Sequence, residues 1–302
     1  MTVSILLATY QGAPFVKAQM ESLLHQTYLD CHILVRDDGS NDGTKGVIAE
    51  YARHFPDKIT LLEEQKNLGI KGNFSRLMEL CPKTPYIAFC DQDDWWQPDK
   101  IEICAREMRR LEMIWGAHTP LLVHTDLVVV DQNLSMIAPS FWNYSYLSPT
   151  KNQLPRLLSQ NVVTGCAMLI NQALLEKAWP IPPEAWMHDW WIALVACCFG
   201  KIQALSIATI LYRQHANNDT GARPYSLRWP SKKMCSLADT CRQGEQLLSR
   251  YTTNLTSSQR DLLSLYCHLP HKRGFSRRWI LWKEGFWKQG WLRNIPHFLL
   301  SS

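Results

Sequence analysis

Residues 85–94 read PYIAFCDQDD, an apolar run that ends directly in three carboxylates. The run is short and is bounded by a proline and by charges, which is typical of a strand buried inside a sheet. Asp91, Asp93 and Asp94 then lie at the carboxyl end of that strand. Like charges so close together raise the free energy of ionising one another. We therefore expect the cluster either to lie in water or to have a positive partner.

Three further apolar runs precede this stretch, at 3–9, 31–37 and 58–64, and a helical pattern follows each of them. Strands that alternate with helices predict an α/β fold, in which helices flank a mostly parallel sheet on both faces. Ligands of such sheets bind beyond the carboxyl ends of the strands. Four residues are expected together at that rim: Tyr10, Asp38, Asn67 and Asp91.

The middle of the chain continues with a mixed pattern. Strands are predicted at 121–131 and 161–171, and a helix follows around 173–178. The run at 188–199 is typical of a buried helix, and one or two strands follow at 201–213. These elements are expected to complete the sheet and its covering layers.

Charge divides the 302 residues into two regions. Residues 1–222 hold 18 Lys and Arg against 23 Asp and Glu, whereas residues 223–302 hold 14 against 4. Because the strand pattern also ends there, we predict an α/β domain at 1–222 and a basic helical extension at 223–302. The extension carries Trp279, Trp282, Trp287 and Trp291 among Arg and Lys. Such a helix either lies in a membrane interface or packs its aromatic stripe on the main domain.

The composition is that of a soluble globular protein, with 46% hydrophobic and 20% charged residues. No apolar stretch reaches the ~18 residues of a spanning helix, and the chain starts with a strand-like run rather than a leader. Ten cysteines without paired spacing indicate reduced thiols. We expect a cytoplasmic protein, and the interfacial alternative for the extension implies peripheral attachment at the inner face of the cytoplasmic membrane.

The D-x-D spacing of Asp91 and Asp93 could bring two carboxylates onto one hard divalent cation, which prefers oxygen ligands. The alternative is a solvated acidic turn, in which Asp94 favours the start of a helix near Pro98. The spacing alone does not decide between them.

Four motifs follow one another along the chain: ATYQG at 8–12, DDGSNDGT at 37–44, NLG at 67–69 and DQDDWWQPDK at 91–100. In this order they resemble family 2 of the glycosyltransferases, nucleotide-sugar enzymes with the GT-A (Rossmann-like) fold. The resemblance covers about residues 1–220. Three later stretches are similar to the family's acceptor-side strand, its catalytic acidic motif and its His-bearing loop: TGCAMLIN at 164–171, MHDWW at 187–191 and LYRQHANN at 211–218. The DQDDxW and YRQH forms are most similar to bacterial rhamnosyltransferase-like members.

The resemblance implies a role for each motif. Tyr10 would stack on the nucleobase, and Asp38 would accept a hydrogen bond from the imide N–H of uracil or thymine. The residues implied in nucleotide binding are Thr9, Tyr10, Asp38, Asn67, Lys71 and Asp91. Those implied in holding Mg²⁺ or Mn²⁺ on the diphosphate are Asp93, Asp91 and His215. Those implied near the acceptor or in support are Asp94, Trp95, His188, Trp190 and Arg213.

Asp189 is the candidate general base that the resemblance implies. In an inverting transferase, an acceptor hydroxyl attacks the anomeric carbon opposite the leaving group, and a carboxylate must take its proton. Trp190 and Trp191 would provide a dry wall that raises the pKa of Asp189. The alternative is that Asp189 caps the following helix, and the two roles are compatible. Relatives commonly carry Glu-Asp where this chain has His188-Asp189, which leaves the role of His188 open.

The implied activity is therefore an inverting, metal-dependent transfer of a sugar, with rhamnose as a candidate. The donor would be a dTDP- or UDP-sugar. The acceptor would be a glycan or lipid-linked glycan of a bacterial surface polysaccharide, O-antigen or capsule. The alternative from another class is a non-catalytic scaffold that binds sugar nucleotides in a glycan assembly complex. A missing base or metal carboxylate would favour it, and both are present. Nucleic acid is not an expected partner, because the four Trp suit an interface better than a phosphate track.

Overall fold

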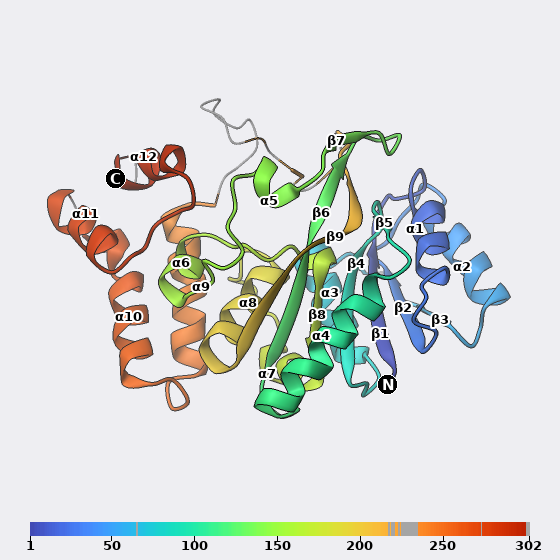
Figure 1. Ribbon diagram of the computed structural model, residues 1–302, viewed down its shortest axis with the longest axis horizontal. Coiled ribbons are helices and arrows are strands. Elements are labelled where there is room, and N and C mark those ends of the chain that lie inside the picture. Colours follow the sequence, from blue (N-terminus) through green and yellow to red (C-terminus); the bar gives the residue numbers. More distant parts are fainter. Residues whose placement is uncertain are drawn as a thin grey trace.

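One mixed sheet of nine strands forms the centre of the protein, and helices cover both of its faces (Figure 1). The computed structural model describes residues 1–64, 66–216, 218, 221–222, 224, 235–272 and 274–299. The strands are β1 Val3–Thr9, β2 Cys31–Asp37, β3 Ile59–Leu62, β4 Tyr86–Asp91, β5 Trp95–Trp96, β6 Leu121–Val130, β7 Met136–Ala138, β8 Met168–Asn171 and β9 Lys201–Arg213. The helices of the main domain are α1 Val16–Leu24, α2 Thr44–His54, α3 Gly69–Leu80, α4 Lys100–Trp115, α5 Phe141–Tyr144, α6 Leu154–Ser159, α7 Gln172–Ala178 and α8 His188–Phe199. The C-terminal helices are α9 Leu237–Arg250, α10 Ser257–Cys267, α11 Gly274–Lys283 and α12 Trp291–Leu299.

The strand order is β3-β2-β1-β4-β8-β6-β9-β5, with β7 paired to β6. The first four strands in sequence are mutually parallel, as predicted. Beyond them the sheet is mixed, because β8 runs antiparallel to both β4 and β6 while β9 runs parallel to β6. The α/β class with flanking helices is thus confirmed, and the antiparallel pairs make the whole sheet less parallel than the sequence pattern indicates.

The register of the parallel strands aligns their carboxyl ends. Thr9 at the end of β1 pairs with Asp37 of β2, and Ala8 pairs with Asp91 of β4. The loops that carry Tyr10, Asp38 and the carboxylate cluster therefore leave the sheet at one level. This common rim is where the fold places ligands.

The core follows from strict alternation along the strands. Leu6 of β1 faces a cluster formed with α3, α6, α7 and α8, whereas Ile5 and Leu7 face a cluster formed with α1, α2 and α4. The first cluster continues into the C-terminal helices, where Tyr266 of α10 and Leu281 of α11 are fully buried. The predicted extension thus shares one hydrophobic core with the α/β domain.

The segment 161–171 differs from the predicted strand, since only Met168–Asn171 is extended in the sheet. The Asn161 side chain bonds both the N–H and the carbonyl of Val163, and this local pairing competes with strand hydrogen bonds. A 3₁₀ turn at Gly165–Ala167 then leads into β8. No helix among the described residues is long and apolar enough to cross a membrane.

Candidate active site

The loop after β1 is joined to the carboxylate motif by Gln92. The Tyr10 N–H donates to Gln92 Oε1 at 2.8 Å, and Gln92 Nε2 donates to the Tyr10 carbonyl at 2.8 Å. Gly12 leaves room for this pair, because an added Cβ would lie 2.1 Å from Gln92 Oε1 and would displace the Gln92 amide. The Tyr10 ring itself is 50% exposed, which leaves it open to a planar ligand. The sequence alone assigned no role to Gln92. Its place between the two carboxylates of the D-x-D motif is the feature that could have drawn attention to it.

Asp38 is almost fully buried, and both of its oxygens accept hydrogen bonds from the chain. Oδ1 accepts from Arg36 Nη1 at 2.7 Å and from the Leu68 N–H at 2.8 Å. Oδ2 accepts from the Gly69 N–H at 2.8 Å, and the Asn67 side chain donates to the Asp38 carbonyl. Asp38 therefore anchors the turn before α3, and its contact with a nucleobase stays a prediction.

Two other residues implied in nucleotide binding make contacts within the chain. The Thr9 hydroxyl, which is buried, donates to Asp37 Oδ2 at 2.8 Å. Lys71 Nζ donates to the carbonyls of Pro183 and Ala185, at 2.7 and 2.5 Å. Lys71 thus ties α3 to the segment that precedes α8.

The Asp93 carboxylate and the His215 ring, predicted to act together, are in direct contact. His215 Nε2 lies 2.7 Å from Asp93 Oδ2, and Asn218 Nδ2 donates to the same oxygen at 3.1 Å. Arg213 Nε donates to the Asp93 carbonyl at 2.8 Å. The Phe15 ring stacks on His215 with centroids 4.5 Å apart. The His-bearing loop after β9 therefore closes over the carboxylate motif.

Asp94 differs from its two neighbours, because it is fully buried. Its Oδ1 accepts a hydrogen bond from the Arg213 N–H at 3.2 Å. Burial, with the charges of Asp93 and Asp91, raises the pKa of Asp94 well above its usual range. The buried Asp94 carboxyl supports the His-bearing loop through the Arg213 N–H and is not accessible to an acceptor. The raised pKa of Asp94 explains how three carboxylates can lie so close together, because Asp94 does not have to ionise.

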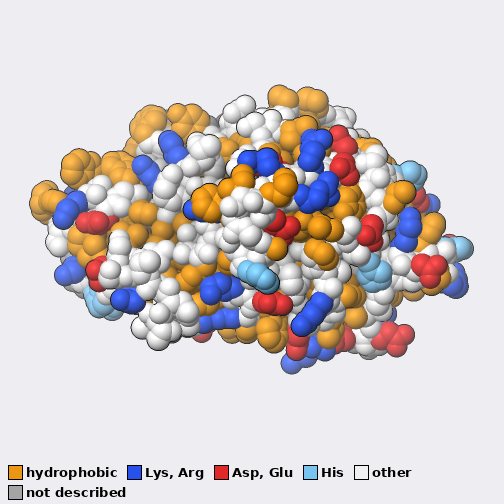
Figure 2. Space-filling view, turned by 60° about the horizontal axis from the view of Figure 1, so that its bottom comes forward, with side chains coloured by type: hydrophobic (Ala, Val, Ile, Leu, Met, Phe, Trp, Pro, Cys, Tyr) orange, Lys and Arg blue, Asp and Glu red, His pale blue; other side chains and the backbone are white. Residues whose placement is uncertain are grey.

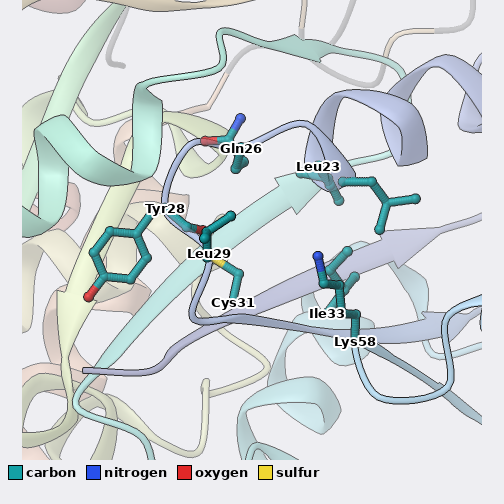
Figure 3. Close-up of a pocket in the computed structure, with 8 residues that line it drawn as sticks. Leu23, Gln26, Tyr28, Leu29, Cys31, Ile33 and Lys58 are labelled. Carbon is teal, nitrogen blue, oxygen red and sulfur yellow. The ribbon is translucent and has the colours of Figure 1, made fainter.

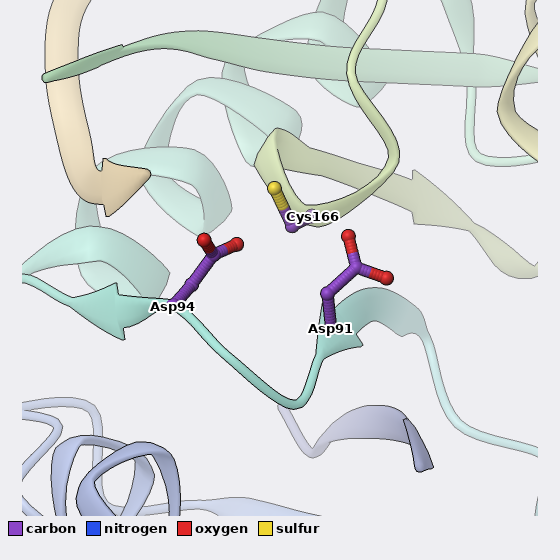
Figure 4. A group of neighbouring side chains, drawn as sticks. All are labelled: Asp91, Asp94 and Cys166. Carbon is purple, nitrogen blue, oxygen red and sulfur yellow. The ribbon is translucent and has the colours of Figure 1, made fainter. Parts of the chain in front are cut away.

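One group of side chains among the described residues has the geometry to ligate a metal ion. Figure 4 shows the side chains of Asp91, Asp94 and Cys166 gathered in one place, and their ligand atoms lie within 4.8 Å of each other. Burial raises the pKa of the Cys166 thiol, so the sulfur stays protonated and is a poor ligand. Carboxylate oxygens suit Mg²⁺ or Mn²⁺. Asp91 belongs to this group and Asp93 does not, so a Mg²⁺ or Mn²⁺ ion held by Asp91, Asp93 and His215 stays a prediction.

Asp189 is the second residue of α8, whose N-cap is Met187, so the predicted capping alternative is wrong. Its Oδ2 accepts from the Gly165 N–H at 3.1 Å, and its Oδ1 accepts from the Trp190 N–H at 2.6 Å. Burial raises the pKa of Asp189 to about 7. The Asp189 carboxylate thus binds the backbone of the residue that precedes Cys166, whose side chain lies in the group with Asp91 and Asp94. A carboxyl with this pKa is suited to accept a proton near neutral pH.

Three residues assigned to the acceptor side lie in or beside the core. His188 is 3% exposed and stacks on Phe74 with centroids 3.9 Å apart, and burial lowers its pKa to about 3. Trp190 is buried, and its indole N–H donates to the Leu157 carbonyl at 2.6 Å. Trp95 lies in the edge strand β5. His188 and Trp190 therefore pack in the core, which fits a supporting role beside Asp189 rather than a contact with the acceptor.

We expect Gly165→Ala to impair the site through Asp189. The new Cβ would lie 2.7 Å from His188 Nε2, so the loop must move and carry its N–H away from Asp189. Overpacking of this kind costs about 1–3 kcal/mol, measurable as a lower melting temperature together with slower turnover. The matched control is Gly46→Ala in α2, where nothing lies within 4 Å of the new Cβ. An unchanged Gly165→Ala variant would contradict this reading.

A pocket elsewhere on the surface is unrelated to this rim. It lies at the amino ends of the strands, between Cys31, which begins β2, and Lys58, which precedes β3 (Figure 3). The remaining lining residues are Leu23, Leu24, Gln26, Tyr28, Leu29 and Ile33. Its position at the opposite edge of the sheet separates it from the carboxylate cluster.

Comparison with known proteins identifies the class to which this fold and site belong. The model of glycosyl transferase family 2 matches residues 4–179, and the chain belongs to that family. An uncharacterised glycosyltransferase of Nostoc sp. is 27% identical over 248 residues, covering 80% of this chain and 73% of the relative. A dTDP-rhamnosyl transferase of Shigella flexneri is 28% identical over 239 residues, covering 72% and 74%. The chain is thus a glycosyltransferase related to rhamnosyltransferases.

Solved structures share the fold at low sequence identity. The TarS protein of S. aureus, in complex with UDP-GlcNAc, has a TM-score of 0.61 and 14% identity, covering 100% of this chain and 79% of that one. A mannosyltransferase of Pyrobaculum calidifontis, in complex with GDP-Man and Mn²⁺, has a TM-score of 0.54 and 16% identity, covering 92% and 71%. These similarities confirm the GT-A architecture.

Proposed function

We propose that the protein is an inverting, metal-dependent glycosyltransferase that uses a dTDP- or UDP-sugar, with rhamnose as the candidate sugar. The acceptor is a glycan or lipid-linked glycan of a bacterial surface polysaccharide. The observation that supports the proposal is the hydrogen bond from the Gly165 N–H to Asp189, a carboxyl whose pKa burial raises to about 7, because Gly165 precedes Cys166 of the group with Asp91 and Asp94. The similarity to a dTDP-rhamnosyl transferase supports the choice of sugar.

In the proposed reaction, the acceptor hydroxyl oxygen forms a bond to the anomeric carbon as the bond from that carbon to the diphosphate oxygen breaks. The hydroxyl proton passes to a carboxylate oxygen of Asp189. Tyr10 offers an exposed ring for the base. A cation held by Asp91 and Asp93 would stabilise the charge that develops on the departing diphosphate.

The proposal is tested with a panel of nucleotide sugars in the presence of Mn²⁺ or Mg²⁺, scored by donor hydrolysis and by thermal shift. One donor is expected to stabilise the protein only when the metal is present. The absence of any metal-dependent donor effect across UDP- and dTDP-sugars would contradict the proposed activity.

Asp93→Asn should weaken metal-dependent donor binding. The amide removes the negative charge that would face the cation. Loss of a residue that only hydrogen-bonds to a metal ligand already lowers metal affinity by ~10- to 100-fold, so loss of a ligand should have at least that effect. The measurement is the metal concentration needed for half of the donor-induced thermal shift. The control is Asp99→Asn, which alters an exposed carboxylate in the same segment, at the N-cap of α4. Equal metal dependence in both variants would show that Asp93 does not hold the ion.

A further inference from the structure

The two last helices present apolar side chains to solvent. On α11, Phe275, Trp279 and Trp282 are 80%, 40% and 62% exposed, and their spacing of four and three places them on one helical face. On α12, Trp291 and Ile295 are 67% and 43% exposed. These five residues form the outer aromatic face. Hydrophobic and basic side chains gather at the end of the molecule where α11 and α12 lie (Figures 1 and 2).

The helices attach to the domain by other residues. Leu281 and Phe286 are fully buried, and the Phe286 ring lies 4.7 Å from that of Tyr266. Trp287 packs on Phe298, with centroids 5.0 Å apart. Of the four Trp in the predicted stripe, Trp287 packs against α12, whereas Trp279, Trp282 and Trp291 are exposed, so most of the stripe does not pack on the main domain. Apolar area of this kind, left outward on a protein surface, marks an interaction site.

The charge around this face indicates its occupant. Lys272, Arg278 and Lys283 are exposed in or next to α11. Residues 271–299 contain seven Lys and Arg and a single acidic residue, Glu284. Trp flanked by basic residues is typical of helices that lie in the headgroup region of a membrane, where Lys and Arg are attracted to anionic lipids. A protein partner would more often have a mixed polar rim around the apolar centre.

We propose that the outer aromatic face docks on the surface of an anionic phospholipid bilayer. Exposed aromatic rings enter the headgroup layer, and Arg278 and Lys283 remain at the level of the phosphates. Docking would hold the rim near lipid-linked acceptors, but it does not depend on the proposed sugar transfer. Vesicle binding can therefore succeed or fail independently of the catalytic test.

The test is co-sedimentation of the full chain with vesicles of phosphatidylcholine and phosphatidylglycerol, compared with vesicles of phosphatidylcholine alone. We expect binding to the mixed vesicles. The triple variant Phe275→Ser, Trp279→Ser, Trp282→Ser should bind at least ~10-fold more weakly, because burying one large apolar side chain contributes about that factor. Arg278→Gln with Lys283→Gln should lose roughly fivefold for each charge at low salt.

The matched control is Trp115→Ser. Trp115 is 48% exposed at the end of α4, and Lys201 Nζ lies 4.3 Å from its ring centroid, so it resembles the tested Trp in exposure and in its basic neighbour. Its vesicle binding should equal that of the parent. Unchanged binding by the triple variant, or equal binding of the parent to both vesicle types, would overturn the proposal. So would a parent that forms a dimer, does not bind vesicles, and becomes monomeric in the triple variant. If the triple variant fails to fold, the vesicle binding of the variant with Arg278→Gln and Lys283→Gln decides whether the proposal holds.

Discussion

Asp189→Asn should abolish sugar transfer while donor binding persists. Asparagine keeps the shape of the side chain and an oxygen to accept from the Gly165 N–H, but it cannot take a proton from the acceptor. General-base catalysis contributes roughly 10²- to 10⁴-fold, and we expect a loss of that size in the rate of transfer. The measurement pairs product formation with the donor-induced thermal shift, which should be unchanged.

The control for this variant lies five residues upstream. Glu184 is exposed in the segment before α8, and Glu184→Gln should transfer sugar like the parent. Normal transfer by Asp189→Asn would remove Asp189 from the role of base. Loss of donor binding together with transfer would instead indicate that the carboxylate holds the loop at Gly165. If the unsubstituted protein also binds the donor but transfers no sugar, the result would favour the alternative of a non-catalytic scaffold.

The pH dependence of transfer follows from the same group. Burial raises the pKa of Asp189 to about 7, so the carboxyl is largely protonated below that pH and cannot act as a base. The rate of transfer should fall about tenfold per pH unit below pH 7 and level off above it. Donor binding measured at the same pH values separates this effect on the rate from a change in donor affinity. A rate that is flat between pH 5 and 8 would contradict the assignment.

The sequence predicts the parallel half of this fold well, because each buried strand is a short apolar run closed by turn residues. The bounds of β1, β2 and α8 coincide with the predicted ones. The strand predicted at 161–171 was too long, since β-branched residues there are buried in a loop held by Asn161. Hydrophobic periodicity reports burial, and a buried loop has the same signature as a buried strand.

The candidate site divides in the same way. The sequence motifs identify Asp93 and His215 as candidate site residues, and in the structure their side chains are in contact. Contacts between distant segments, such as that of Gln92 with Tyr10, have no periodic signal, because both positions belong to irregular loops. Arg36 is the clearest omission. A charged residue within an apolar run indicates an exposed position, yet its side chain is fully buried.

The Arg36 guanidinium organises the part of the rim around Asp38 through several partners at once. Nη1 donates to Asp38 Oδ1 at 2.7 Å and to Asn73 Oδ1 at 3.1 Å. Nε donates to Glu64 Oε2 at 2.9 Å, and Nη2 donates to the Lys66 carbonyl at 2.7 Å. A buried charge requires such complete pairing, since an unpaired one carries a large desolvation cost.

Arg36→Met should therefore strongly destabilise the protein. Methionine fills similar space but leaves the Asp38 carboxylate buried without its counter-charge, and removal of one partner of a buried pair costs about 3–5 kcal/mol. At roughly 2–4 °C per kcal/mol, the melting temperature should fall by roughly 6–20 °C. The Asn67–Gly69 turn would lose its anchor, so donor binding should weaken as well.

Two variants separate the buried pair from ordinary surface charge. Arg76 also binds Glu64, at 2.6 Å, but it is partly exposed and screened by water, so Arg76→Met should destabilise the protein far less than Arg36→Met. Arg36→Met combined with Asp38→Asn should recover part of the loss, because no unpaired buried charge remains. Arg76 and then Arg36 lower the pKa of Glu64 to about 2. The stability that Glu64 contributes is present above its unfolded-state pKa and is lost as the pH falls toward 2, and Arg36→Met should reduce this acid dependence.

A variant with both Arg36→Met and Asp38→Asn that is less stable than Arg36→Met alone would contradict the pairing argument. It would show that Asp38 gains its stability from the Leu68 and Gly69 N–H groups rather than from the guanidinium.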